Sequence, residues 1–158
     1  MRLAGLVVAL LVAAAALAQA DPPRRKSGLW HISITSSHMP PVQVHECVER
    51  NHDDFLALSS MGEEARACSK HSVRREGANV VSETICKMNG STVTSRGVFT
   101  GSFESAYKAD MKATYRPPYE GIAETTMKME GRWLGACKPG QKPGDTTVLE
   151  VRGVPKKR

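Results

Sequence analysis

Four histidines fall seven residues apart, at His31, His38, His45 and His52, and Met39 follows the second of them. Imidazole and thioether groups are ligands for copper, and imidazole also binds zinc. Such a spacing would align side chains on a long helix, but this region has the alternating pattern of strands, so the regularity carries no weight by itself. The candidate metal ligands are His31, His38, Met39 and His45, on one predicted hairpin. Solvated surface histidines are the simpler interpretation, and we assign no metal or cofactor.

Catalysis has little support in the residue pattern. Ser59 and Ser60 stand outside any Gly-x-Ser-x-Gly motif. Asp53 and Asp54 could form an acid pair, but acidic residues at the start of a helix explain them more simply. The sequence also has no motif that combines aromatic and basic residues for nucleic-acid binding. We therefore expect a protein without catalytic residues, which is not an enzyme and has no nucleic-acid partner.

The first twenty residues have the pattern of a secretory signal peptide. Arg2 precedes an uncharged run from Leu3 to Leu17, and Ala18-Gln19-Ala20 is an Ala-x-Ala cleavage site. The run is shorter than the roughly 20 apolar residues that span a bilayer. We expect cleavage near Ala20, export to the periplasm or the medium, and no transmembrane segment afterwards. Without Arg2 the chain keeps 21 Lys and Arg against 16 Asp and Glu, a net charge of +5.

The mature length suits a single domain. We predict a signal peptide over residues 1–20, a disordered segment over 21–27, one β domain over 28–152 and a basic tail over 153–158. Basic residues cluster only at Arg24–Lys26 and Lys156–Arg158, and both clusters fall in segments that we expect to be disordered. The charge is therefore interpreted as a solvated surface.

Cys47, Cys68, Cys86 and Cys137 are an even number of cysteines in a chain expected to be exported. Two disulfides are the default, and three pairings are possible. A predicted hairpin centred on Gly77 places Cys68 opposite Cys86. Opposed residues have Cα atoms roughly 4.5 to 5.5 Å apart, within the range of about 4.4 to 6.8 Å that a disulfide needs. Cys47 and Cys137 then pair by elimination.

Alternation of apolar and polar residues predicts most of the fold. The dipeptide Asn89-Gly90 is a hairpin turn that sets Cys86 opposite Val93, and residues 51–61 change period and predict a short helix. The strands are expected at 29–35, 42–47 (with Val44 opposite Ile34), 69–75, 79–85, 103–115, 122–134 and 146–152, with a further strand after the turn. The fold class is mainly β with one short α-helix. About seven strands form a curved antiparallel meander sheet, either part-barrel or sandwich-like.

The apolar faces of these strands must be buried against something. A curved sheet can leave a cavity lined by aromatic and methionine side chains, as in many ligand pockets. The alternative is that the same side chains fill one another's space as a core. We favour a binding module for a small apolar ligand or an envelope component. The alternatives are a protein-interaction or envelope-maintenance module, or a copper or zinc binder. The candidate pocket residues are Trp30, Phe99, Phe103, Tyr107, Met111, Met127, Met129 and Trp133.

Several short motifs together carry a family resemblance. They are Gly28-Leu29-Trp30, Cys47-Val48, Cys86 before an Asn-Gly turn, Arg96-Gly97-Val98-Phe99 and, most specific, Gly131-Arg132-Trp133-Leu134-Gly135-Ala136-Cys137. With these motifs the chain resembles the exported bacterial proteins known as domain of unknown function 3617 (DUF3617), over nearly all of the mature sequence. The resemblance implies a periplasmic or secreted single-domain protein and brings no site residues with it.

Overall fold

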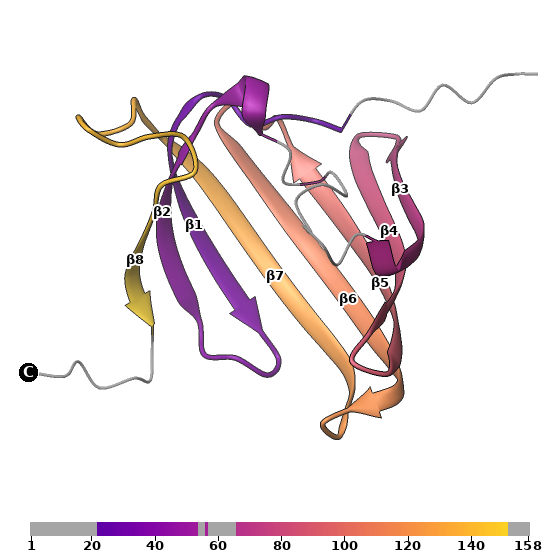
Figure 1. The fold of residues 1–158 in the computed structure, drawn as a ribbon. Coiled ribbons are helices and arrows are strands. Elements are labelled where there is room, and N and C mark those ends of the chain that lie inside the picture. The colour runs from indigo at the N-terminus through magenta and orange to yellow at the C-terminus, as the bar shows by residue number, and fades with distance from the viewer. Residues whose placement is uncertain (1–21, 54–55, 57–65, 152–158) are drawn as a thin grey trace, which may run out of the picture.

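The computed structural model describes residues 22–53, 56 and 66–151, and these residues form one antiparallel sheet of eight strands (Figure 1). The prediction of a mainly β protein is therefore confirmed. The predicted signal peptide and the basic tail lie outside the described residues. The strands are β1 (Gly28–Ser36), β2 (Val42–Val48), β3 (Cys68–Glu76), β4 (Asn79–Met88), β5 (Ser91–Gly101), β6 (Ala106–Tyr119), β7 (Ile122–Gly135) and β8 (Thr146–Val151), with the 3-10 helix η1 at Arg50–His52.

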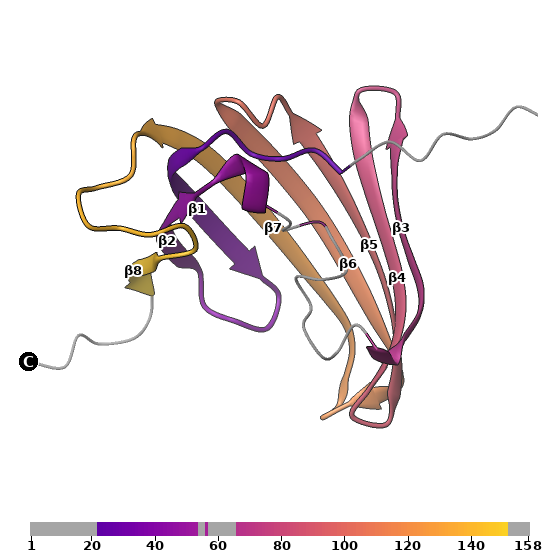
Figure 2. The ribbon, with the colours of Figure 1, turned by 45° about the horizontal axis from the view of Figure 1, so that its top comes forward.

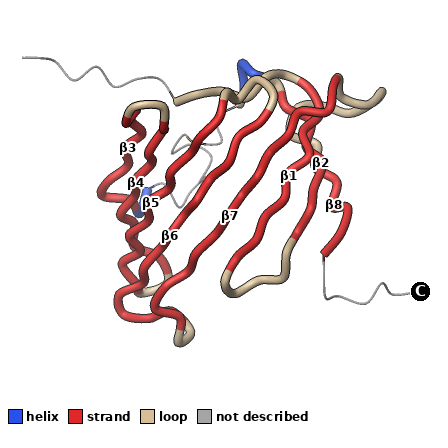
Figure 3. The backbone as a smooth tube through the Cα atoms, turned by 180° about the vertical axis from the view of Figure 1, so that it is seen from behind, coloured by secondary structure: helices blue, strands red, loops and turns tan. Residues whose placement is uncertain are grey.

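The sheet is open and curled, and its strand order is β3-β4-β5-β6-β7-β1-β2-β8. Strands β3 to β7 form the predicted meander, the hairpin of β1 and β2 attaches to the far side of β7, and β8 attaches to β2. Figure 2 shows the sheet curling into a trough, and Figure 3 shows the strand order from behind. All described strands belong to this one sheet, which favours the part-barrel over the sandwich.

The hairpin registers show which turns the residues specify. Asn89 and Gly90 both have positive φ, as a type I′ turn requires, and Cys86 lies opposite Val93 as predicted. In the first hairpin Val44 lies opposite Ile32 rather than Ile34, so the predicted register was wrong. The pairing is displaced by two residues because the loop spans 37–41. A displacement by two keeps each side chain on its predicted face.

Phe103 was wrongly predicted to begin a strand. Strand β6 begins at Ala106, and Phe103 has a left-handed φ of 59° in the preceding loop. The hydroxyl of Ser102 accepts hydrogen bonds from the backbone N–H groups of Glu104 and Ser105, so a local turn replaces the start of the ladder. The Phe103 ring still reaches the core, where it is 4% exposed.

Residues 22–27, which fall in the segment expected to be disordered, make specific contacts with the rest of the fold. Arg25 is 4% exposed, and Lys26 N–H donates to the carbonyl of Phe103 at 2.8 Å. The Lys26 ammonium also lies 3.7 Å from the ring centroid of Trp133. Residues 22–27 cross one end of the trough before entering β1 (Figure 2). The segment thus closes that end of the sheet.

The predicted helix over 51–61 is represented in the described residues only by the 3-10 helix Arg50–His52. Residues 54–55 and 57–65, on which the rest of that prediction falls, lie outside the described residues. Leu56 is 7% exposed and belongs to the apolar core. No helix among the described residues is long and apolar enough to cross a membrane.

Two glycines in the strands make room for aromatic rings on the inner, apolar face of the trough. A Cβ placed on Gly131 would come within 2.1 Å of the Tyr107 ring, and one on Gly97 within 2.8 Å of the Phe99 ring. Each ring therefore lies flat over bare backbone, which a larger residue would prevent. This explains why Gly-Arg-Trp and Arg-Gly-Val motifs occur inside strands, where glycine otherwise weakens pairing.

Candidate functional site

The inner face of the sheet divides into a closed end and an open end. The closed end contains Trp30, Phe99, Phe103 and Tyr107, each at most 4% exposed. The Tyr107 ring stacks on Phe103 with a centroid distance of 5.6 Å and lies 5.6 Å from Trp30. These four predicted pocket residues fill one another's space, so the structure places them in the core rather than around a cavity.

The other predicted pocket residues lie farther along the trough, where the inner face is only half-buried. Two cross-strand rows meet there: Ile34 lies opposite Met129, and Met127 lies opposite Met111. All four side chains are partly exposed. We call Ile34, Met111, Met127 and Met129 the methionine strip. Trp133, the last predicted pocket residue, is half-buried and packs against the core from the closed end.

A buried ion-pair cluster, which the sequence analysis did not identify, lies beside the closed end. The Arg25 guanidinium bonds the Asp53 carboxylate at 2.8 Å and the Glu46 carboxylate at 2.7 Å. The Asp53 side chain is 2% exposed. Burial by itself lowers the pKa of Arg25, but the hydrogen bonds to Asp53 and Glu46 outweigh it and raise the pKa, so the guanidinium stays charged.

The residues of this cluster lie in sequence patterns that indicate other roles. Arg25 stands among other basic residues next to a cleavage site, and Asp53 stands beside a second aspartate before an apolar run. Both patterns have common local explanations, and nothing local tells that the two side chains meet across 28 positions. The cluster ties the segment before β1 to the end of η1 and thereby holds the closed end in place.

We expect the burial of Tyr107 to be visible in an alkaline titration. Burial, opposed by Arg25, raises the pKa of Tyr107 from 10.0 to about 12. Its stabilising effect is therefore complete below about pH 10 and is lost as the pH rises towards 12. Tyrosinate absorbance should show a late ionisation step that is missing in Tyr107→Phe. An unchanged titration curve in that variant would contradict the burial.

The histidine hairpin brings together two of the four predicted metal ligands. His31 lies directly opposite His45, and their ring centroids are 5.4 Å apart. His38 lies at the hairpin loop, where its Nε2 is 2.8 Å from the carbonyl of Glu124, and Met39 is 53% exposed beside it. Among the described residues no three His, Cys, Asp or Glu side chains group as metal ligands. A site made of all four predicted residues is thus not assembled.

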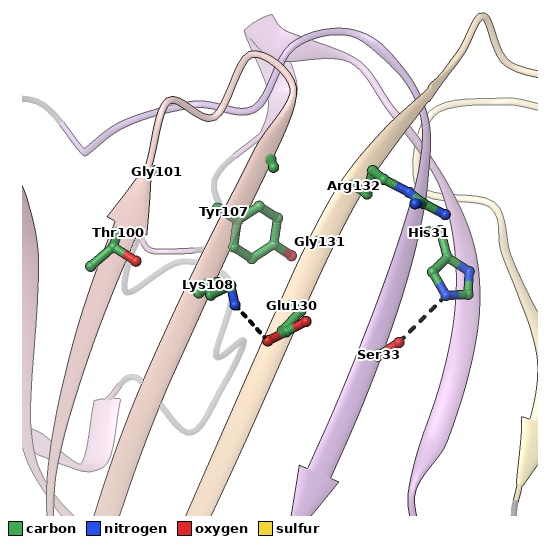
Figure 4. Close-up of a pocket in the computed structure, with 10 residues that line it drawn as sticks. His31, Ser33, Thr100, Gly101, Tyr107, Lys108, Glu130, Gly131 and Arg132 are labelled. Atoms are coloured by element: carbon green, nitrogen blue, oxygen red, sulfur yellow. Dashed lines mark hydrogen bonds and ion pairs between the residues drawn. The ribbon is translucent and has the colours of Figure 1, made fainter.

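The outer face of the sheet is polar and carries two shallow hollows. One, of about 520 Å³, spans β5, β6, β7 and β1 and is lined by residues that include His31, Lys108 and Arg132 (Figure 4). The other lies over the middle of β5, β6 and β7, and its lining combines charged and threonine residues with Val98, Met111 and Met127. Cross-strand ion pairs such as Lys108 with Glu130, at 3.0 Å, run across this face.

The two disulfides join the pairs that the sequence predicts, Cys47 with Cys137 and Cys68 with Cys86.

In a comparison with known protein families, residues 25–137 match the family model described as "Protein of unknown function (DUF3617)". No curated protein and no solved structure matches the chain. The matched range begins at the buried arginine of the ion-pair cluster and ends at the second cysteine of the longer disulfide.

Proposed function

The chain belongs to the DUF3617 family of proteins of unknown function, and from that premise we propose that it is an exported, non-catalytic binding module that holds an apolar ligand along the inner face of its sheet. The observation that carries this proposal is the methionine strip. It continues the apolar core beyond the closed end, yet its side chains remain half-buried. A concave apolar surface of this kind is the usual chemistry of a ligand site.

The composition of the strip suits an adaptable site. Methionine is unbranched and flexible, and its thioether contacts varied apolar shapes at little cost. The closed end is built differently, with stacked rings over glycines and a buried ion-pair cluster. A rigid end and a deformable end on one face favour a ligand that enters from the open side and stops against the aromatic rings.

Export is supported by the cysteine usage. Disulfides form and persist in oxidising compartments such as the periplasm, and the described residues contain no free cysteine. Together with the signal-peptide pattern of residues 1–20, this supports a protein that acts outside the cytosol. A lipid or another apolar envelope component is the ligand class that this location offers.

Native mass spectrometry of the protein purified from its own cell envelope tests the proposal. We expect a chain that begins near Asp21, has lost the four thiol hydrogens, and carries a lipid-sized adduct. Met127→Lys, which places a charge in the strip, should lose the adduct. Thr126→Lys places the same charge one residue away on the exposed outer face and should keep it. The two variants should differ because burying an unpaired charge beneath an apolar ligand costs free energy, whereas a charge on the exposed face does not.

Several outcomes would contradict the proposal. A protein that never carries an adduct, or a Thr126→Lys variant that loses it as Met127→Lys does, would exclude the strip as the site. A full-length chain with free thiols in the cytosol would exclude export.

A second candidate function rests on strand β8. It is an edge of the described sheet, and its Val148 and Leu149 are 59% and 44% exposed. The opposite edge, β3, carries Lys70, Arg74 and Arg75, which discourage strand pairing. An edge without basic residues and with exposed apolar side chains favours a protein partner that adds a strand. In the native spectrum this alternative predicts a bound protein in place of a lipid-sized mass.

A further inference from the structure

Four basic side chains gather on the outer face of β7, β1 and β2, next to the longer disulfide. His31 lies between its neighbours in the sheet, opposite His45 on β2 and opposite Arg132 on β7. Figure 4 shows the Arg132 side chain extending from β7 towards His31. Lys138 follows Cys137 and acts electrostatically on His45. We call His31, His45, Arg132 and Lys138 the cationic cluster.

The charges of this cluster are not balanced by the described side chains. None of the described ion pairs includes Arg132 or Lys138. The nearest carboxylate along β7, that of Glu130, is paired with Lys108 on β6 at 3.0 Å. The Nδ1 atom of His45 is buried and has no hydrogen-bond partner among the described residues. Such an atom is costly unless something satisfies it.

We propose that the cationic cluster binds a phosphate-bearing anion on the outer face of the sheet. Arginine offers a planar fork of donors to an oxyanion, lysine adds a point charge, and each imidazole can donate one N–H or two. The hollow beside His31 and Arg132 gives the anion room and adds the hydroxyl of Ser33. This site lies on the opposite face from the methionine strip and does not depend on the function proposed above.

The surroundings favour an anion over the metal ion that two facing histidines first suggest. A divalent cation here would stand beside an arginine and a lysine, which repel it. No third metal-ligating side chain joins the pair among the described residues. An anion has the opposite balance, because every charged member of the cluster attracts it.

Binding should strengthen as the pH falls. Burial, His31 and Lys138 together lower the pKa of His45, so the empty site disfavours its charged form. A bound anion would counteract the electrostatic contribution of His31 and Lys138 to this lowered pKa. The groups that face His45 are His31 from β1, Thr147 from β8 and Lys138 from the loop. Arg132 and the paired Glu130 lie one strand farther away, on β7. As the pH falls, protonated His45 then adds to the attraction.

The test is a titration of the purified, disulfide-bonded protein with inorganic phosphate, followed by the histidine ring signals in NMR. We expect saturable shifts of the His31 and His45 signals, and we expect phosphate to bind more tightly in mildly acidic than in mildly alkaline buffer. Arg132→Met should weaken phosphate binding about tenfold or more. Lys112→Met is the matched control on the same face, because Lys112 is absent from the lining of this hollow. Lys112 is already paired with Glu124 at 2.7 Å, so its removal should change the affinity by no more than about twofold.

A second arm distinguishes free phosphate from a lipid headgroup. Vesicles of phosphatidylglycerol, compared with vesicles of phosphatidylcholine, should bind the protein in an Arg132-dependent way if the anion is displayed on a membrane. Saturable binding of inorganic phosphate without vesicle binding identifies a soluble ligand, and either result supports the site. Equal losses in Lys112→Met and Arg132→Met, the absence of histidine shifts on addition of phosphate together with the absence of vesicle binding, or zinc binding to the histidine pair without phosphate binding would overturn it.

Discussion

An Arg25→Met variant is expected to lose about 3–5 kcal/mol of unfolding free energy. Methionine keeps the length of the side chain but removes its charge. The Asp53 carboxylate, 2% exposed, then remains in the interior without the guanidinium that now bonds it at 2.8 Å. Taking one member from a buried pair leaves the other as an uncompensated charge, which costs more than the pair itself contributes.

Chemical denaturation of the purified variants provides the measurement, with Arg24→Met as the matched control. Arg24 is exposed, and within the part of the chain that the structure describes its side chain bonds the backbone carbonyls of Arg50 and Asn51. Its loss should therefore cost no more than about 1 kcal/mol. Arg25→Lys keeps the charge but not the fork of donors, and should fall between the two. Similar midpoints for Arg24→Met and Arg25→Met would show that the cluster does not hold the closed end.

Removing the longer disulfide is expected to destabilise the protein by about 2–5 kcal/mol. The Cys47→Ser/Cys137→Ser double variant avoids an unpaired thiol. This bridge spans 90 positions and holds the loop after β7 against β2, where Cys47 also exchanges backbone hydrogen bonds with Gly144 and Asp145. Removing the bridge increases the conformational entropy of the unfolded chain, because a long loop is no longer closed. It also removes one of the contacts that hold the loop carrying Lys138.

The shorter disulfide is the natural comparison. Cys68 and Cys86 lie on neighbouring strands that are already paired in register, and the bridge spans only 18 positions. In the chain-entropy model, the ratio of these loop lengths makes the longer bridge more stabilising by about 1.4 kcal/mol. Thermal unfolding of both double-serine variants under oxidising conditions measures the difference. A larger loss from the shorter bridge would show that native-state contacts, rather than loop closure, dominate.

The strands and their faces could be predicted because they depend on local pattern. A period of two places Ile34, Met111, Met127 and Met129 on apolar faces whatever the partner strand is, and Asn89-Gly90 specifies its own turn geometry. The same locality explains the disulfide at the second hairpin, because a tight turn fixes which residues face each other. The predicted register was wrong only between β1 and β2, where the connecting loop is longer.

The candidate sites could be predicted only in part. The apolar residues were recognised as a set, but the division between a packed aromatic end and a half-buried methionine strip depends on Gly97 and Gly131 meeting rings from other positions. The hairpin predicted that His31 and His45 share a face, but their direct pairing depends on the register that the prediction missed. Their neighbours Arg132 and Lys138 did not, since β7 joins β1 across about a hundred residues.

By itself, the order of residues determined the strands, the apolar faces, the cysteine pairs and the family, because each follows from short-range periodicity, turn chemistry or a motif read in one stretch. Only the tertiary structure decided that Arg25 is buried against Asp53 and Glu46, and that basic side chains from three strands and a loop share one surface. These meetings depend on how the sheet curls and on which strand lies beside which. The free energy that selects among such arrangements comes from burial across the whole domain, so it depends on contacts between distant segments and cannot be inferred from one segment alone.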